Sequence, residues 1–277
     1  MILIAQISDL HLRPRGLPAL GFVDTNALAR RAVATLLALR PVPAAVLVTG
    51  DIADSGDPRE YAMAREILSA LPMPVHVIPG NHDRREAMRA GLADTGWIGP
   101  GGSGAINYTA DVGPLRLVCL DSLVEGRALG ELGADGLAWL DATLASAPDR
   151  PTLVALHHPP FRTGLSHMDS ILLRDGAAMD EVVRRHPQVG RVVCGHVHRA
   201  ITAAFGGTLA MIVPGVAHQV ALDLADSATA LFVMEPPAYF AHTWTAETGF
   251  VSHLQYVERF PGPYDFGLAE GASRPGS

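Results

Sequence analysis

The chain has 277 residues, 48% of them hydrophobic, and a formal net charge of −7. This length and apolar content allow one large domain with a sizeable core. The acidic balance argues against a nucleic-acid polymer or an anionic membrane surface as the main partner. In addition, no apolar stretch approaches the length of a membrane span.

The cysteines and the N-terminus bear on the compartment. Two cysteines occur, Cys119 and Cys194, and both lie in apolar runs, which predicts buried free thiols. Such thiols suit a reducing compartment. The first residues enter a strand-like run directly, without a basic segment followed by a long apolar run. We therefore expect a cytoplasmic protein.

The first half of the chain alternates strand-like and helical segments. Short apolar runs predict strands at 2–7, 44–48, 75–78 and 152–156, and two more at 105–110 and 115–120 around a Gly-Pro turn. Apolar residues at helical spacing, together with capping and proline signals, predict helices at 24–40, 58–70, after Asp83, 134–147 and 176–186. The glycine-rich stretch 94–104 is predicted to be a loop.

The second half is predicted to be rich in strands, at 191–194, 200–205, 208–213, 218–222, 228–234, 238–245 and 250–257. This order predicts an α/β fold with two stacked mixed β-sheets and helices outside. The expected domain covers 1–260, and the Gly- and Pro-rich segment 261–277 is expected to be a tail. The run 239–244 has two interpretations, a core strand or a contact between copies in a homo-oligomer, and we favour the core.

Five polar blocks follow five of the predicted strands. Loops at the carboxyl ends of strands are where α/β proteins place their chemistry. Side chains two apart on a strand point the same way, so an Asp-x-His or His-x-His pair can reach one metal ion. A carboxylate can bridge two cations, and an amide oxygen is a neutral ligand. The blocks supply seven candidate metal ligands: Asp9, His11, Asp51, Asn81, His157, His196 and His198.

The blocks D-x-H, G-D, G-N-H-D, H-H-P-P and G-H-V-H resemble those of the calcineurin-like metallophosphoesterase superfamily. More narrowly, the chain is similar to the bacterial class III cyclic-nucleotide phosphodiesterase and glycerophosphodiester phosphodiesterase branch. Further similarity lies at 21–24, 58–61, 168–169 and 214–219. The resemblance implies the metallo-dependent phosphatase fold, an α/β/β/α four-layer sandwich of two mixed sheets.

The resemblance also implies two divalent or mixed-valence transition metal ions of the Fe, Mn, Zn or Co type. One ion would be held by Asp9, His11, Asp51 and His198. The other would be held by Asp51, Asn81, His157 and His196. Asp51 would bridge the two ions together with a solvent hydroxide, which would attack phosphorus in line with the leaving alkoxide.

Further roles follow from the resemblance. His82 would face the phosphate as a catalytic residue, and Asn81 would contact substrate as well as metal. Asp54 has two interpretations, a partner that orients the His82 ring or an ordinary turn aspartate. His218 is either a substrate contact or a hydrogen-bonded loop histidine. His158, next to a ligand, is interpreted as structural.

Charge favours a small-molecule phosphodiester as substrate, and the resemblance implies a 3′,5′-cyclic nucleotide or a glycerophosphodiester. Two divalent ions bring about +4, and Asp9 and Asp51 cancel about half, which leaves an excess that suits a monoanionic diester. Ser55 lies where phosphoprotein phosphatases of the superfamily carry an arginine. The alternatives are a phosphomonoesterase or a nucleotide pyrophosphatase. A non-catalytic scaffold is disfavoured because every ligand and His82 are present.

Overall fold

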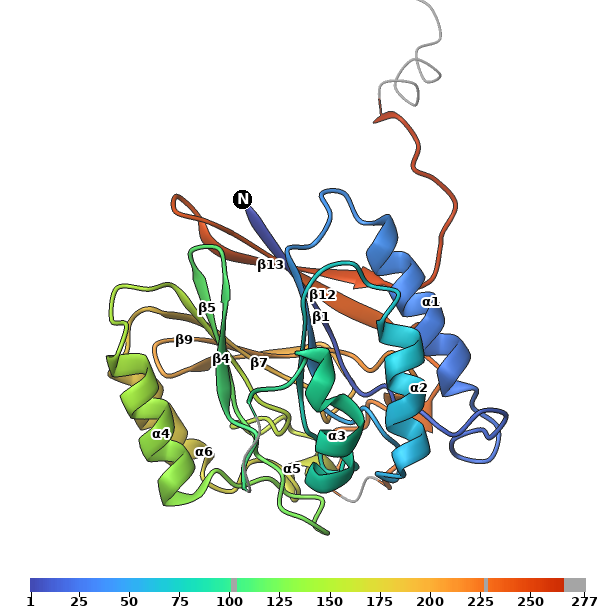
Figure 1. The fold of residues 1–277 in the computed structure, drawn as a ribbon, viewed down its shortest axis with the longest axis horizontal. Coiled ribbons are helices and arrows are strands. Elements are labelled where there is room, and N and C mark those ends of the chain that lie inside the picture. Colours follow the sequence, from blue (N-terminus) through green and yellow to red (C-terminus); the bar gives the residue numbers. More distant parts are fainter. Residues whose placement is uncertain (101–103, 227–228, 267–277) are drawn as a thin grey trace, which may run out of the picture.

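The computed structural model describes residues 1–100, 104–226 and 229–266. In this part of the chain two large mixed sheets lie face to face (Figure 1). The first sheet has the order β13-β12-β1-β2-β3 and contains β1 (Ile2–Ile7), β2 (Ala45–Thr49), β3 (Val75–Ile78), β12 (Ala238–Thr245) and β13 (Gly249–Tyr256). The second has the order β4-β5-β6-β7-β9-β8 and contains β4 (Tyr108–Val112), β5 (Leu115–Cys119), β6 (Thr152–Ala155), β7 (Val189–Cys194), β8 (Ile201–Phe205) and β9 (Thr208–Ile212).

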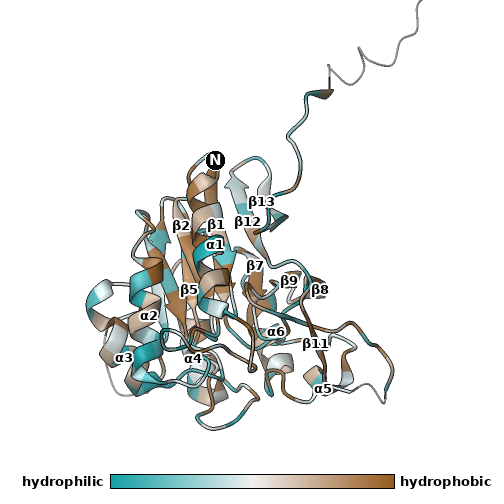
Figure 2. Ribbon diagram, turned by 90° about the vertical axis from the view of Figure 1, so that its right-hand side faces the viewer, coloured by the Kyte–Doolittle hydropathy of each residue, from teal (hydrophilic) through white to brown (hydrophobic). Residues whose placement is uncertain are grey.

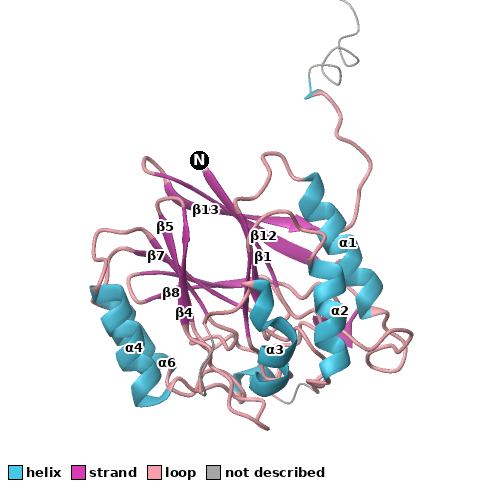
Figure 3. Ribbon diagram, in the orientation of Figure 1, coloured by secondary structure: helices cyan, strands magenta, loops and turns pink. Residues whose placement is uncertain are grey.

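Helices cover the outer face of each sheet (Figure 3). Those on the side of the first sheet are α1 (Thr25–Ala38), α2 (Pro58–Leu68) and α3 (Arg85–Leu92). Those on the side of the second are α4 (Gly133–Ala145) and α6 (Gly176–Arg184), and a short α5 (Ser166–Asp169) lies in the loop before α6. The layer order α/β/β/α confirms the predicted fold class.

The predicted helix signals act at the positions expected. Asp24 caps α1, with its carboxylate accepting the Ala27 amide at 2.9 Å, and the helix ends before Pro41. Asp57 and Glu60 form a capping box at the start of α2, where Pro58 occupies the first turn. These local hydrogen bonds explain why both helix boundaries could be predicted to within a few residues.

Several predictions of strands were wrong in extent. β4 begins at Tyr108 rather than near residue 105. The loop expected at 94–104 overlaps a 3₁₀ turn, Ala93–Thr95. Residues 101–103 of that loop lie outside the described residues. The strands predicted at 218–222 and 228–234 are reduced to β10 (Gln219–Val220) and β11 (Phe232–Val233), a separate two-stranded ribbon; residue 228 is not described. Phe232 and Val233 of β11 are exposed, whereas in β10 Gln219 is buried and Val220 is partly buried against the core.

The two sheets share a core between them, visible as brown strands in Figure 2. The strand interpretation of 239–244 is supported, because Tyr239, Phe240 and His242 are buried in β12. Cys119 and Cys194 are buried and free, as predicted. Residues 261–266 of the predicted tail run away from the body in Figure 1, and 267–277 are not described. Among the described residues, no helix has the length and apolar character needed to cross a bilayer.

Candidate metal centre

The five polar blocks meet where the carboxyl ends of β1, β2 and β3 face those of β6 and β7. Backbone hydrogen bonds join the loops that follow these strands. The Asp9 amide donates to the Gly50 carbonyl at 3.1 Å, and the His11 amide donates to the Asp51 carbonyl at 2.9 Å. The Gly195 amide donates to the His157 carbonyl at 3.1 Å within the second sheet. These bonds hold side chains from both sheets together at the carboxyl ends of the strands.

The backbone in the loops that follow these strands is strained. Among the described residues, six non-glycine residues have a positive φ, and five of them are predicted metal ligands: Asp9 (56°), His11 (44°), Asp51 (48°), His196 (72°) and His198 (51°). Such conformations cost on the order of 1–3 kcal/mol each and persist only where surrounding structure enforces them. The strain turns each side chain back over the end of its strand and into the cluster.

Glycines allow the two sheets to approach this closely. A Cβ atom on Gly195 would lie 2.0 Å from the Ser8 hydroxyl and 2.9 Å from an Asp9 carboxylate oxygen. A Cβ on Gly50 would lie 2.3 Å from His157 Nδ1. Only glycine at these two positions leaves space for the neighbouring side chain.

The first predicted ligand group converges as expected from its sequence blocks. Asp9, His11, Asp51 and His198 each offer one ligand atom, and these atoms lie within 4.8 Å of one another. His198 Nε2 lies 3.2 Å from Asp9 Oδ1, and His11 Nε2 lies 3.3 Å from His198 Nε2. Asp51 Oδ2 lies 3.8 Å from His11 Nε2.

The second group shares Asp51 with the first. His157 Nε2 lies 3.3 Å from Asp51 Oδ2 and 3.1 Å from Asn81 Oδ1. The His196 ring lies 5.1 Å from the His157 ring, centroid to centroid, and its Nε2 contacts the Ile171 carbonyl at 3.1 Å. His196 could therefore reach a metal only through Nδ1. Asp51 is the side chain common to both groups.

Contacts at Nδ1 determine which tautomer three of the histidines adopt when neutral. The Nδ1 atoms of His157 and His198 lie 2.7 and 2.8 Å from the carbonyl oxygens of Thr49 and His218, and carbonyls can only accept. His11 Nδ1 lies 3.2 Å from Asp54 Oδ1. A histidine that donates from Nδ1 presents Nε2 as a ligand, which is the usual arrangement of metal-binding imidazoles. The donor set thus fits divalent transition metals.

Electrostatics at the cluster also suit cations. Burial alone would raise the pKa of Asp9, but the His198 imidazole outweighs it and lowers the pKa to about 2. Burial likewise opposes charge on Asp51, and His157 nevertheless holds its pKa well below the usual range. Asp51 in turn outweighs the burial of His157 and raises the pKa of that imidazole to about 9. Two buried, ionised carboxylates therefore require positive charge beside them.

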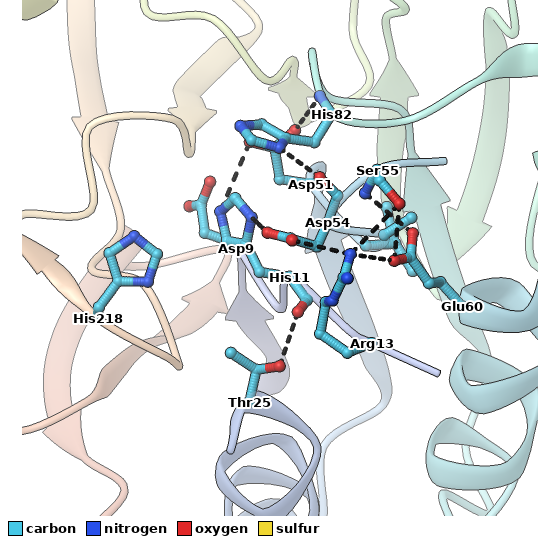
Figure 4. A network of polar contacts seen from close by, with 12 residues as sticks. Asp9, His11, Arg13, Thr25, Asp51, Asp54, Ser55, Glu60, His82 and His218 are labelled. Atoms are coloured by element: carbon cyan, nitrogen blue, oxygen red, sulfur yellow. Dashed lines mark hydrogen bonds and ion pairs between the residues drawn. The ribbon is translucent and has the colours of Figure 1, made fainter. Parts of the chain in front are cut away.

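The predicted catalytic residues surround this cluster (Figure 4). The His82 amide donates to Asp51 Oδ1 at 2.9 Å, and its Nδ1 lies 2.7 Å from the backbone carbonyl of Asp54. The Asp54 carboxylate contacts His11 instead of His82. The His218 ring lies 4.6 Å from the His198 ring, and its Nδ1 has no hydrogen-bond partner. His158 is buried and contacts the Ser122 hydroxyl at 2.8 Å.

Asp83 is a residue of the site that sequence reasoning missed. Its buried carboxylate accepts the amides of Gly80, Ile52 and Ala53 at 2.8, 3.2 and 3.0 Å, and so joins the loop after β3 to the loop after β2. Burial raises its pKa to about 6. Its place at the end of G-N-H-D was the only available signal.

Two features flank the cluster on the surface. A pocket of about 260 Å³ opens beside His82 and includes Arg84 and Arg127 in its lining. On the opposite flank the rings of Phe22 and Phe232 stack at 6.0 Å, and Phe232 lies 5.4 Å from the His218 ring. Both phenylalanines are exposed. A larger hollow of about 750 Å³, between the region of α5 and β8, contains none of the predicted ligands.

The four-layer fold and the carboxylate–imidazole cluster at its strand ends together define a metallophosphoesterase. The chain belongs to the calcineurin-like phosphoesterase family, whose model matches residues 2–200. Solved structures agree on the fold: a dimetal phosphatase from Danio rerio superposes with a TM-score of 0.63 at 17% identity, covering 93% of this chain and 99% of that one.

Relatives of known name share more of the sequence. The glycerophosphodiester phosphodiesterase of Enterobacter lignolyticus is 35% identical over 95% of this chain and 94% of its own length. The 3′,5′-cyclic adenosine monophosphate phosphodiesterase of Escherichia coli K12 is 33% identical over 78% of this chain and 76% of its own.

Proposed function

We propose that this protein hydrolyses small-molecule phosphodiesters at a dinuclear metal centre. The observation that carries the proposal is that seven candidate ligands from five strand ends form two adjacent groups, and that Asp51 lies near histidines of both. We assign one ion to Asp9, His11, Asp51 and His198. We assign the other to Asp51, Asn81, His157 and His196. A scaffold without activity would not need this strained arrangement.

The ions are proposed to be of the Fe, Mn, Zn or Co type, since oxygen and imidazole ligands are mixed. Two such ions would neutralise phosphoryl oxygens and activate a water nucleophile. The protein supplies the geometry: Asp51 fixes the spacing of the two ligand groups, and Asn81 completes the second group with a neutral oxygen. Asn81 also lies beside the position expected for the phosphate.

His82 is proposed to act on the leaving oxygen. Its Nδ1 donates to the Asp54 carbonyl, so Nε2 is the atom left to face substrate. Burial disfavours charge on this ring, but Asp51, the Asp54 carbonyl and the carboxylates of Asp54 and Asp83 together outweigh burial and raise the pKa of His82. A ring that retains its second proton can donate it to an alkoxide. His218, with its unpartnered Nδ1, is proposed to contact substrate from the other side.

The surroundings support a diester with further groups to bind. Arg84 and Arg127 line the pocket beside His82 and add positive charge there. Ser55, which also lines this pocket, lies where phosphoprotein phosphatases of the superfamily carry an arginine and is itself uncharged. We expect diesters to be preferred to monoesters, because the positive excess of two divalent ions over Asp9 and Asp51 suits a monoanion.

Two substrate classes are supported by different observations. Similarity to the glycerophosphodiester phosphodiesterase extends over nearly the whole chain, which favours glycerophosphodiesters. The exposed Phe22–Phe232 pair next to His218 favours a substituent with a planar ring, as in a 3′,5′-cyclic nucleotide.

The two buried free thiols support a cytoplasmic location. A homo-oligomer, the alternative interpretation of residues 239–244, would need a contact outside the buried part of β12.

One panel tests the proposal. The protein, loaded with Mn²⁺ or Zn²⁺, is assayed with a cyclic nucleotide, a glycerophosphodiester, an aryl phosphodiester and the matching aryl monoester. We expect kcat/KM to be higher for the aryl diester than for its monoester. The reverse ranking would make the protein a phosphomonoesterase, and no turnover of any ester would overturn the proposed activity.

A further inference from the structure

Glu60, a buried glutamate that is not a predicted metal ligand, accepts four hydrogen bonds in a network next to the metal centre. Glu60 is 0% exposed. Its Oε1 accepts from Arg13 Nη1 at 2.8 Å and from the Ser55 hydroxyl at 2.9 Å. Its Oε2 accepts from the Ser55 and Asp57 amides at 2.9 and 3.1 Å. One carboxylate thus fastens the loop before α2 and the loop after β1 together.

The network leads directly to the two imidazoles on this side of the site. Arg13 Nη1 also donates to Asp54 Oδ2 at 3.1 Å, while Asp54 Oδ1 lies 3.2 Å from His11 Nδ1. The backbone carbonyl of Asp54 holds His82 Nδ1 at 2.7 Å. Asp54 is therefore the shared support of a predicted ligand and of the predicted proton donor. Figure 4 shows these contacts running from Glu60 through Arg13 and Asp54.

We propose that Glu60 and Arg13 are positioning residues for the metal centre, which orient His11 and His82 together through Asp54. The inference rests on the metal-binding role proposed for His11. Arg13 holds the outer oxygen of the Asp54 carboxylate, so the inner oxygen stays directed at His11. Glu60 holds Arg13 and the amide of Ser55, so the Asp54 backbone stays where it meets His82.

The backbone around Arg13 is itself fixed, which gives the network a rigid base. The Arg13 amide donates to Asn26 Oδ1 at 3.1 Å, and Asn26 Nδ2 donates back to the Arg13 carbonyl at 2.9 Å. The Thr25 hydroxyl donates to the His11 carbonyl at 2.7 Å. The start of α1 therefore anchors the loop that carries His11, and α2 anchors its partner Asp54.

The competing explanation is that Glu60 only caps α2. Its bond to the Asp57 amide is half of the capping box, and that function needs neither Arg13 nor Asp54. The two explanations differ in what happens to metal binding. A cap supports helix stability alone, whereas a positioning residue acts on the ligand that it orients, typically by about 10–100-fold in metal affinity or activity.

The test substitutes Glu60→Gln in the full chain. An amide has one acceptor oxygen, so either the backbone amides or Arg13 must lose its partner. We expect Mn²⁺ affinity of the metal-free protein, measured by electron paramagnetic resonance of free Mn²⁺, to fall about 10–100-fold, with lower kcat and a nearly unchanged KM. Asp57→Ala removes the other half of the capping box and is the matched control. It should lower the unfolding temperature but keep the Mn²⁺ affinity.

Two further variants keep the test decisive. Glu66→Gln alters an exposed ion-paired glutamate on the same helix and should change neither quantity. If Glu60→Gln fails to fold, Arg13→Gln tests the same link, and Arg13→Lys, which retains the charge, should recover part of the lost affinity. Wild-type affinity in Glu60→Gln, or an equal loss in Asp57→Ala, would overturn the inference. Failure of the wild-type protein to bind Mn²⁺ would instead overturn the proposed function.

Discussion

Asp51 is the residue on which both ligand groups depend. Replacing it by alanine removes the shared oxygen and also the acceptor of the His82 amide. We expect Asp51→Ala to lose both metals, and Asn81→Ala to weaken mainly the second group, because Asn81 Oδ1 lies 3.1 Å from His157 Nε2 in that group. Elemental analysis of the purified variants measures this. Two tightly held metals in Asp51→Ala would contradict the assignment of a bridging ligand.

His82 distinguishes substrates by their leaving groups. A proton donor accelerates reactions by about 10²–10⁴-fold when the leaving alkoxide is basic. We therefore expect His82→Ala to reduce turnover of a cyclic nucleotide or glycerophosphodiester strongly, and that of a nitrophenyl diester only modestly. Steady-state kinetics on both substrates at equal metal content provides the measurement. Equal losses would indicate that His82 stabilises charge on the phosphoryl oxygen instead.

At the residue scale, the sequence indicated the clustered carboxylates and imidazoles better than the residues that support them. Asp-x-His and Gly-His-x-His follow apolar strands, so strand alternation and loop position place their side chains at one edge. Glu60 could be recognised only as a capping residue, because a capping box looks the same whether or not its carboxylate also binds an arginine 47 residues away. Asp54 was expected beside His82, and contacts it through its backbone, a partner that side-chain chemistry could not predict.

At the element scale, the close approach of the two sheets makes Gly195 critical. A methyl group there would collide with Ser8, the Thr49 carbonyl and Asp9. We expect Gly195→Ala to push the loop after β7 away from β1, and so to lower both metal content and unfolding temperature. Gly207→Ala is a control for glycine substitution, since a methyl group at that position would have no atom within 4 Å, although its positive φ adds strain. Normal metal binding in Gly195→Ala would contradict the steric argument.

The ribbon of β10 and β11 gives a prediction about specificity. Phe232 lies between Phe22 and His218. Stacking of a base on an aromatic ring contributes about 1–3 kcal/mol, so Phe232→Ala should raise KM for a cyclic nucleotide roughly 5- to 150-fold. KM for a glycerophosphodiester should change little. Leu231→Ala, an exposed neighbour on the same segment, is the control. Equal effects on both substrates would exclude a stacking role.

The same ribbon shows where element prediction fails. Residues 231–234 are apolar and therefore indicate a buried strand, yet all four side chains are exposed. A strand is recognised from its own residues, but its burial depends on whether another layer packs against its face, which is a property of the whole fold. The boundaries of α1 and α2 were predictable for the opposite reason, because caps are formed by neighbours in sequence.

For the molecule as a whole, metal binding should depend on pH. The raised pKa of His157, about 9, means that this imidazole carries a second proton, and so a positive charge, in the metal-free protein at neutral pH. A metal ion must displace that proton, so affinity should rise about tenfold per pH unit toward pH 9. The stability of the metal-free chain changes in the opposite direction. The His157–Asp51 pair stabilises that chain, and this contribution is lost as pH rises through 9. Mn²⁺ isotherms at pH 7 and 8 measure the first effect; equal affinities would contradict it.

The position of β1 in its sheet also has a consequence for synthesis. β1 pairs on one side with β2 and on the other with β12, where Ile2 lies opposite Trp244. At typical rates of about 5–20 residues per second, the ribosome needs roughly 10–50 s to reach β12 after making β1. During this interval the β12 side of β1 has no native partner, so nascent chains expose an apolar strand edge. Translation speed and chaperone access should therefore affect the yield of this enzyme.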